Sequence, residues 1–308
     1  MESALQREAF MNPRFKRNLV LHFMLIPGII VSVLFSYIPL AGSVMAFQKY
    51  NPLLGFFNSQ WIGLDNFRFI ANLPGTFQVI WNTVYIAVLK MIGGIIVPVA
   101  FALLLNEISQ SKIKRTFETF IYIPNFLSWI ILSGIFIDLL SPTEGIVNKV
   151  LIAFGMEPIF FLGDPFWFPI VMVLTDIWKS FGFGTVIYLA ALTSINPELY
   201  ESAMIDGAGR WNQTLHITLP GISPIVILMS VLALGNILNA GFDQIFNMYS
   251  PVVYSTGDVI DTFIYRLGLQ QRQYSPATAV GLFKSLVSFF FVSLSYILAD
   301  KLANYRIF

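Results

Sequence analysis

The sequence predicts an all-α integral membrane protein with six transmembrane helices. Of its 308 residues, 56% are hydrophobic and only 11% are charged, whereas soluble domains carry roughly 25% charged residues. The mean hydropathy of the chain is +0.72. Apolar blocks recur along the chain, and each is long enough for the stretch of about 20 residues that a helix needs to cross a bilayer.

Polar or aromatic segments separate six apolar blocks, which lie at about residues 19–47, 78–106, 117–140, 166–194, 222–246 and 277–299. The first block exceeds the roughly 7–15 residues of a signal-peptide core, so we interpret it as a retained span that tilts or kinks at Pro27 and Pro39. No repeat, low-complexity tract or linker divides the chain. Residues 1–308 are therefore expected to form a single transmembrane domain.

The composition also argues against several classes of function. The net charge is only +1, so there is no basic surface that would favour a nucleic acid. Cysteine is absent, and His22 and His216 are far apart in the sequence, which argues against a thiolate or histidine metal site. The nearest string to a phosphate loop, at residues 281–285, lacks the required glycine spacing. We expect no catalytic, cofactor or metal site in this chain.

The polar loop at residues 196–220 interrupts the apolar blocks and predicts two short helices. Asn196 is suited to cap the first helix, and Pro197 and Glu198 suit its first turn. Gly207 can end this helix because glycine readily adopts the left-handed conformation found just past helix ends. The second helix is expected to carry three apolar residues on one face and to stop at a Pro-Gly pair; these residues are Trp211, Leu215, Leu219, Pro220 and Gly221.

The distribution of lysine and arginine predicts the orientation of the chain. If the N-terminus lies inside, the cytoplasmic segments hold ten of these cations and the external loops hold five. The cations counted inside are Arg7, Arg14, Lys16, Arg17, Lys112, Lys114, Arg115, Arg210, Lys301 and Arg306. Because cytoplasmic loops are enriched in lysine and arginine, both termini and the loop at residues 196–220 are expected in the cytoplasm.

The same loop resembles the EAA loop of the membrane subunits of binding-protein-dependent ABC importers. The matching residues have the family's spacing and are Glu201, Ala203, Asp206, Gly207, Ala208, Leu219 and Pro220, whereas Ser202 replaces the usual alanine. The alternative is an ordinary amphipathic hairpin at the membrane surface. The resemblance implies the permease fold of these importers, in which the helix at residues 198–208 couples to an ATPase.

The resemblance also implies partners and roles. A second permease subunit, two ATP-binding subunits that hold ATP and Mg, and an extracytoplasmic solute-binding protein would complete the importer. Glu201 would make a charged contact with one ATPase, and Gly207 would permit the tight turn after the helix. Glu198 belongs to the same coupling helix.

Three further stretches resemble sugar permeases. Trp61, Gly63, Leu64, Asn66 and Phe67 match the W-x-G-L-x-N-F signature that is common in that group. Residues 37–52 and the string A-T-A-V-G-L-F-K-S, which ends at residue 285, resemble the branch that imports complex oligosaccharides such as alginate and rhamnogalacturonan fragments. The alternative for the aromatic residues is a belt at the membrane interface.

Ionisable residues inside predicted spans are costly in a membrane, so each is a candidate for a functional role. They are Lys90, Asp138, Asp176, Lys179 and Lys284. Asp176 and Lys179 are three residues apart on one predicted helix, and we interpret them as a pair that neutralises itself. Lys90 and Lys284 are expected to pair with a carboxylate on another helix, to reach the interface, or to face an aqueous path.

The fifth block carries a polar face. Asn236, Asn239 and Asp243 are spaced to share one side of a helix, with Phe242 and Phe246 nearby. One interpretation is hydrogen bonding between spans, which contributes about 1 kcal/mol per bond. The other is a path for a sugar, which needs hydrogen-bonding side chains beside aromatic rings. The family resemblance favours the second.

Taken together, the patterns predict a multi-pass permease subunit of an ATP-driven importer in a bacterial cell membrane, with a carbohydrate as substrate and ATP hydrolysis on a separate subunit. The alternative is a secondary transporter driven by an ion gradient, in which inverted repeats and broken helices are typical. A membrane scaffold or insertase is a third class. Neither alternative assigns a role to the loop at residues 196–220.

Overall fold

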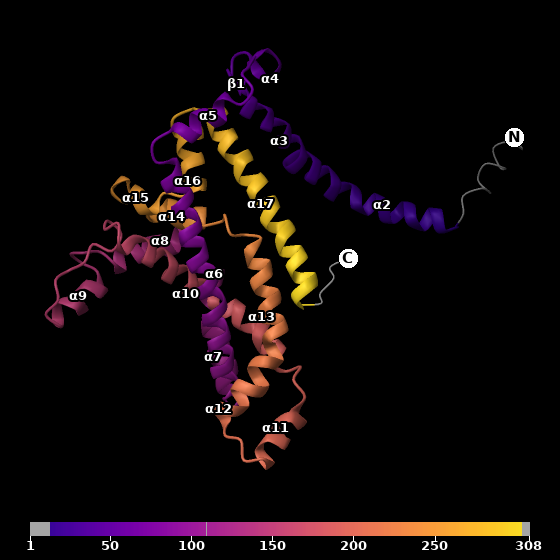
Figure 1. The fold of residues 1–308 in the computed structure, drawn as a ribbon, viewed down its shortest axis with the longest axis vertical. Helices are drawn as coiled ribbons and strands as arrows, with labels where there is room; N and C mark the ends of the chain where they lie inside the picture. The colour runs from indigo at the N-terminus through magenta and orange to yellow at the C-terminus, as the bar shows by residue number, and fades with distance from the viewer. Residues whose placement is uncertain (1–12, 109, 304–308) are drawn as a thin grey trace, which may run out of the picture.

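The computed structural model describes residues 13–108 and 110–303, and these form a helical bundle (Figure 1). Arg7 and Arg306, two of the cations used to predict orientation, lie outside the described residues. Among the described residues, five helices are long and apolar enough to cross a membrane, or six if one bent pair counts as a span. The five are Leu21–Phe47, Thr76–Asn106, Trp167–Leu192, Arg210–Leu234 and Tyr274–Lys301. The predicted all-α membrane fold is confirmed.

The elements follow one another with short connections. The first span and the segment after it comprise α2 Pro13–Ser32, η1 Val33–Tyr37, α3 Ile38–Leu40, η2 Ala41–Phe47, β1 Gln48–Lys49, α4 Gly55–Asn58, β2 Gln60–Trp61 and α5 Asp65–Asn72. The middle of the chain comprises α6 Thr76–Asn106, α7 Ser111–Phe126, α8 Trp129–Leu139, α9 Ile146–Ala153 and α10 Trp167–Leu192.

The polar loop and the fifth span comprise α11 Pro197–Ile205, α12 Arg210–Gln213, η3 Thr214–Thr218 and α13 Leu219–Leu234. The remaining elements are α14 Phe242–Met248, η4 Pro251–Val253, α15 Tyr254–Gly257, α16 Ile260–Tyr265, η5 Arg266–Gln270 and α17 Tyr274–Ala303. In Figure 1, α11 lies at one end of the molecule, and β1, α4 and α5 lie at the other.

Helix α6 runs along the length of the bundle (Figure 1), and three clusters of buried apolar side chains follow it. Val79 near its start packs with α16 and α17, Ile86 packs with α10 and α14, and Ala102 near its end packs with α10 and α13. By contrast, α2 leaves the bundle, and no residue in its most apolar window is buried. The chain therefore forms one bundle with an outlying first helix.

The tryptophan signature near residue 61 builds a hairpin. β1 and β2 pair antiparallel, with Gln48 opposite Trp61. The ring of Trp61 stacks on Phe47 with centroids 5.6 Å apart. The buried amide of Asn66 donates to the carbonyl oxygens of Ala46 and Gln48, each at 2.9 Å. These signature residues therefore fasten α5 to the end of the first span.

The predicted third span at residues 117–140 is not one straight helix. α7 and α8 meet at an angle of 100°. Ser128 caps α8, because its hydroxyl accepts a hydrogen bond from the backbone N–H of Ile131 at 3.3 Å. The block therefore has the length and composition of a span, but a capped second helix starts in a new direction.

The predicted boundaries of the fifth span are wrong at both ends. α12, η3 and α13 form one helical run from Arg210 to Leu234, so Pro220 does not end a helix. Pro220 lies just after the π-type turn η3 within this run, and such local adjustments allow a membrane helix to continue through a proline. The run then stops well short of residue 246, since residues 235–241 form turns, and Gly241 has a φ of +93°.

We predict that Gly182→Ala destabilises the bundle. A Cβ at Gly182 on α10 would collide with the carbonyl oxygen of Ile121 on α7, so the two helices would have to move apart. Overpacking of this kind costs about 1–3 kcal/mol. Thermal unfolding of the purified complex in detergent would measure the loss. Gly94→Ala is the matched control, because a Cβ there meets nothing within 4 Å; equal melting temperatures for both variants would contradict the prediction.

Candidate functional site

The first half of the polar loop folds as predicted. The Asn196 side chain caps α11 by accepting a hydrogen bond from the backbone N–H of Glu198 at 3.1 Å. Gly207 follows the helix with a φ of +79°. The backbone N–H groups of Gly207 and Ala208 then donate to the carbonyls of Met204 and Ala203, at 3.1 and 2.8 Å. This pattern is a Schellman motif, which requires the left-handed residue that glycine supplies.

Side chains fasten α11 to the fifth span. The hydroxyl groups of Tyr200 and Thr218 are 3.0 Å apart in a partly buried hydrogen bond, and the Gln213 amide donates to the carbonyl of Ala208 at 2.8 Å. Arg210 pairs with Glu107 at the end of α6 at 2.9 Å, but this pair is solvent-exposed and contributes little. The hydrogen bonds therefore tie α11 to the helical run that begins at Arg210.

The outer face of α11 combines carboxylates with exposed apolar side chains. Glu198, Glu201 and Asp206 are exposed, and within the described part of the chain nothing pairs with the Glu201 carboxylate. Met204 and Ile205 lie beside them, and Ile205 is 87% exposed. Exposed apolar groups rimmed by polar ones are typical of a protein-binding surface. Sequence analysis missed Met204 and Ile205, although both follow Glu201 on the same short helix.

The other residues of the loop motif have different positions. Ala203 and Ala208 are half-buried and form the turn after α11. Leu219 packs against the buried cluster at the end of α6, and Pro220 is exposed on α13. Of the three residues predicted to share an apolar face, Trp211 is 72% exposed and Leu215 is also exposed. The motif thus has two parts: residues on α11 form an exposed surface, and Leu219 anchors the start of α13 to the buried cluster.

A polar cavity lies at the other end of α13. Asn236 and Asn239 line it together with Lys90 from α6 and Asp176 from α10, and its volume is about 390 Å³. The predicted common helical face is wrong, because Asn236 and Asn239 follow the end of α13 and Asp243 lies on α14. Asp243 is exposed and does not line the cavity. The turns, instead of a helix face, bring the two asparagines together.

Lys90 lines this cavity and connects the residues around it. Its side chain is only 8% exposed, and its ammonium group donates to the carbonyl of Ala240 at 2.7 Å and to the side chain of Gln244. Asp176 lies 3.5 Å from the same nitrogen. Gln244 in turn donates to the carbonyl of Met172 at 2.8 Å. A buried charge is tolerated when it is paired and hydrogen-bonded, as it is here.

The interpretation of Asp176 and Lys179 as a self-neutralising pair is wrong. Asp176 pairs with Lys90, and Lys179 donates to the carbonyl of Asn125 at 3.0 Å, close to the Trp129 ring. Asn125 lies in the last turn of α7, whose carbonyls lack helical partners. Lys179 therefore supports the bend between α7 and α8. Lys284 pairs with the carboxylate of Asp261 on α16, one of the outcomes considered for it.

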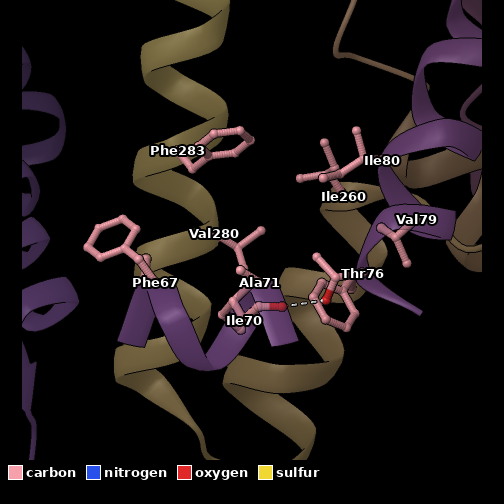
Figure 2. A pocket seen from close by; sticks show the side chains of 11 residues that line it. Phe67, Ile70, Ala71, Thr76, Val79, Ile80, Ile260, Val280 and Phe283 are labelled. Atoms are coloured by element: carbon pink, nitrogen blue, oxygen red, sulfur yellow. Dashed lines mark hydrogen bonds between the residues drawn. The ribbon is translucent and has the colours of Figure 1, made fainter. Parts of the chain in front are cut away.

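A separate cavity near the start of α6 has a different chemistry. Figure 2 shows Phe67, Val79, Ile260, Val280 and Phe283 around a space of about 270 Å³. The single hydroxyl group in its lining, on Thr76, donates to the carbonyl of Ile70 at 2.8 Å. The lining offers no other polar side chain, so it does not suit a sugar.

A membrane bundle with an exposed helix between two spans, and a polar cavity among the spans, is the arrangement expected of a transporter subunit. Residues 91–304 match the family described as binding-protein-dependent transport system inner membrane component. The chain belongs to this family and is a permease subunit of an ABC importer.

Curated relatives resemble the chain along most of its length. Protein LplB of Bacillus subtilis (strain 168) is 40% identical, and the match covers 93% of this chain and 90% of that protein. The polygalacturonan/rhamnogalacturonan transport system permease protein YteP of the same organism is 39% identical over 94% of this chain and 90% of its own length.

A solved structure of a bacterial ABC transporter involved in the import of the acidic polysaccharide alginate superposes with a TM-score of 0.86. The identity is 38%, over 94% of this chain and 98% of that one. The same score is obtained with a bacterial alginate transporter in complex with an alginate pentasaccharide-bound periplasmic protein, at 37% identity over 96% of this chain and 98% of that one. The alternative of a secondary transporter finds no support.

We predict that Lys90→Met destabilises the bundle by roughly 2–3 kcal/mol. The change removes the ammonium group that donates to both Ala240 and Gln244, and it leaves Asp176 without its ion-pair partner. Solvent reaches the 30% exposed carboxylate and limits the loss. Unfolding in detergent would measure it, with the exposed Lys149→Met as control. Adding Asp176→Leu should restore part of the stability; full stability of Lys90→Met alone would contradict the prediction.

Proposed function

We propose that this subunit, with a second permease subunit, forms the path for an oligosaccharide that an extracytoplasmic binding protein delivers to a bacterial cell membrane. The observation that carries the proposal is the polar cavity at the end of α13, where two amides, a lysine and a carboxylate face one space. Such groups match the hydroxyls of a sugar. The resemblance to permeases for pectic polysaccharides and to alginate importers supports the same substrate class.

ATP hydrolysis belongs to two separate ATP-binding subunits, which hold ATP and Mg. One of them receives α11, whose exposed carboxylates and apolar side chains match a groove on a partner. ATP binding closes the ATPase pair and moves α11. Because Tyr200 and Gln213 tie α11 to the helical run from Arg210 to Leu234, the motion reaches the polar cavity at the far end of that run. The cavity then switches between inward and outward access.

The proposal places both termini and α11 in the cytoplasm. α11 and the segment from β1 to α5 lie at opposite ends of the bundle (Figure 1), so the second would face outside. The lysine and arginine bias supports this orientation.

Labelling of single cysteines tests the orientation. The chain has no cysteine, so Ser202→Cys on α11 and Leu53→Cys at the opposite end, both at exposed positions, give two clean probes. An impermeant thiol reagent added outside intact cells should label Leu53→Cys, and should label Ser202→Cys only after the cells are opened. Labelling of Ser202→Cys in intact cells would contradict the orientation.

We predict that Glu201→Lys leaves the membrane subunit folded but weakens its binding to the ATPase. The carboxylate has no partner within the described residues, so an Arg or Ser of the ATPase can take it in a charge-assisted bond, which contributes about 1.5–3 kcal/mol. Co-purification of the ATPase would measure this. Glu157→Lys makes the same charge change on an exposed residue far from α11 in sequence and should retain the ATPase. Full ATPase retention by Glu201→Lys would overturn this role.

Gly207→Asp is expected to assemble partly and couple poorly. A side chain in the left-handed conformation costs roughly 1–2 kcal/mol and alters the turn that holds α11. The measurement is substrate-stimulated ATP hydrolysis in liposomes, relative to the unstimulated rate. A normal ratio of the two rates would show that the turn is not needed for coupling.

The substrate is tested with the complete complex and its binding protein. A panel of oligosaccharides, acidic and neutral, should contain at least one that stimulates ATP hydrolysis and is taken up. Asn239→Ala should then lower uptake of that sugar while leaving subunit assembly intact, because the lost amide faces the cavity. Unchanged uptake kinetics for every transported sugar would contradict the path assignment and favour a purely structural role for Asn239.

A further inference from the structure

A second cavity with polar and aromatic walls lies beside the polar cavity. Its volume is about 640 Å³, within the range of roughly 300–1,000 Å³ typical of ligand sites. α14, α16, η5 and α17 form most of its walls, and Leu40 and Ser43 from the first span complete them. Gly241 lines the polar cavity and the next residue, Phe242, lines this one, so the two cavities adjoin at the start of α14.

One wall is aromatic. The rings of Phe242 and Phe246 stack with centroids 5.1 Å apart and planes 17° from parallel. Tyr265 packs edge-on against Phe246 at 4.6 Å and lies 5.7 Å from Phe242. Phe242 and Tyr265 line the cavity, and both are only half-buried. Phe246 therefore packs behind the rings of Phe242 and Tyr265, and these two rings remain accessible from the cavity.

The lining also carries charge. Asp261, one helical turn before Tyr265 on α16, lines the cavity and forms an ion pair at 2.5 Å with Lys284 on α17. Each of the two charged side chains is about 20% exposed. The pair uses one carboxylate oxygen. Within the described residues, the other oxygen of Asp261 and the hydroxyl of Tyr265 have no hydrogen-bond partner, so both can bind a ligand.

This combination matches a carbohydrate. The C–H face of a sugar ring packs on aromatic rings, and its hydroxyl groups donate to carboxylates. The apolar cavity shown in Figure 2 has aromatic rings but no free polar group, and so lacks half of this chemistry. A lipid chain would leave the Asp261–Lys284 pair facing hydrocarbon, which is costly.

We infer that this cavity is a second carbohydrate subsite, which binds one sugar unit of an oligosaccharide while a neighbouring unit occupies the polar cavity. The inference rests on the proposed function. In the proposed orientation it lies toward the outside, because α17 begins there, so a sugar unit reaches it first. Oligosaccharides long enough to fill both cavities would then be preferred over shorter ones.

The test uses the whole complex with its binding protein in liposomes and compares uptake of the transported oligosaccharide with uptake of its shorter fragments. Phe242→Leu removes one ring but keeps an apolar side chain, and Tyr265→Phe removes only the hydroxyl. Each should lower the ratio of long-chain to short-chain uptake about three- to tenfold, as expected for loss of one ring contact or hydrogen bond. Phe283→Leu, in the apolar cavity, is the control and should leave this ratio unchanged.

The outcomes separate the two hypotheses. If the unmodified complex takes up no oligosaccharide, the proposed function fails and the subsite fails with it. If it does, but Phe242→Leu and Tyr265→Phe keep the same ratio as Phe283→Leu, the subsite is wrong and the function stands. Loss of the second permease subunit from both variants during purification would also overturn the subsite, because the cavity would then be a contact between subunits.

Discussion

The buried ammonium group of Lys90 is the interaction on which the centre of this bundle depends. In a low-dielectric interior the charge requires several partners, and one of them is the carbonyl of Ala240. In a continuous helix that carbonyl would accept the backbone N–H four residues later and be less available to a side chain. The break after α13 and the buried lysine thus require each other. Gln244 extends the connection to α10, so three segments that are distant in sequence are held at one point.

The same principle applies to the bend between α7 and α8. Lys179 donates to the carbonyl of Asn125 in the last turn of α7, where the helix itself provides no donor. Backbone polar groups that face hydrocarbon without partners are costly, so interruptions of membrane helices need such donors. Lys90 and Lys179 therefore each stabilise an interruption of a helix. The interruption after α13, which Lys90 stabilises, places the two asparagines that line the polar cavity.

The arrangement also explains how a motion of α11 would reach the polar cavity that we propose as part of the substrate path. The helical run from Arg210 to Leu234 contains 25 residues, which corresponds to about 37 Å at 1.5 Å per residue. α11 is fastened near its start, and the polar cavity lies just beyond its end. The attachment point Thr218 is the last residue of the π-type turn η3, and such turns are frequent at functional sites. A rigid element with a contact at each end couples two distant sites without a chain of intermediates.

The sequence by itself determined the membrane class, the existence of the polar loop at residues 196–220, and the local fold of the first half of that loop. These features depend on composition, on residues close in sequence such as Asn196 and Gly207, and on a local motif. Only the tertiary structure decided which charges pair, since Asp176 is near Lys179 in sequence but meets Lys90 from another helix. It also decided where helices stop. Residues 235–241 include two glycines and two asparagines, which favour turns, but the break is held by contacts with α6 and α10, which are distant in sequence and supply its hydrogen-bond partners.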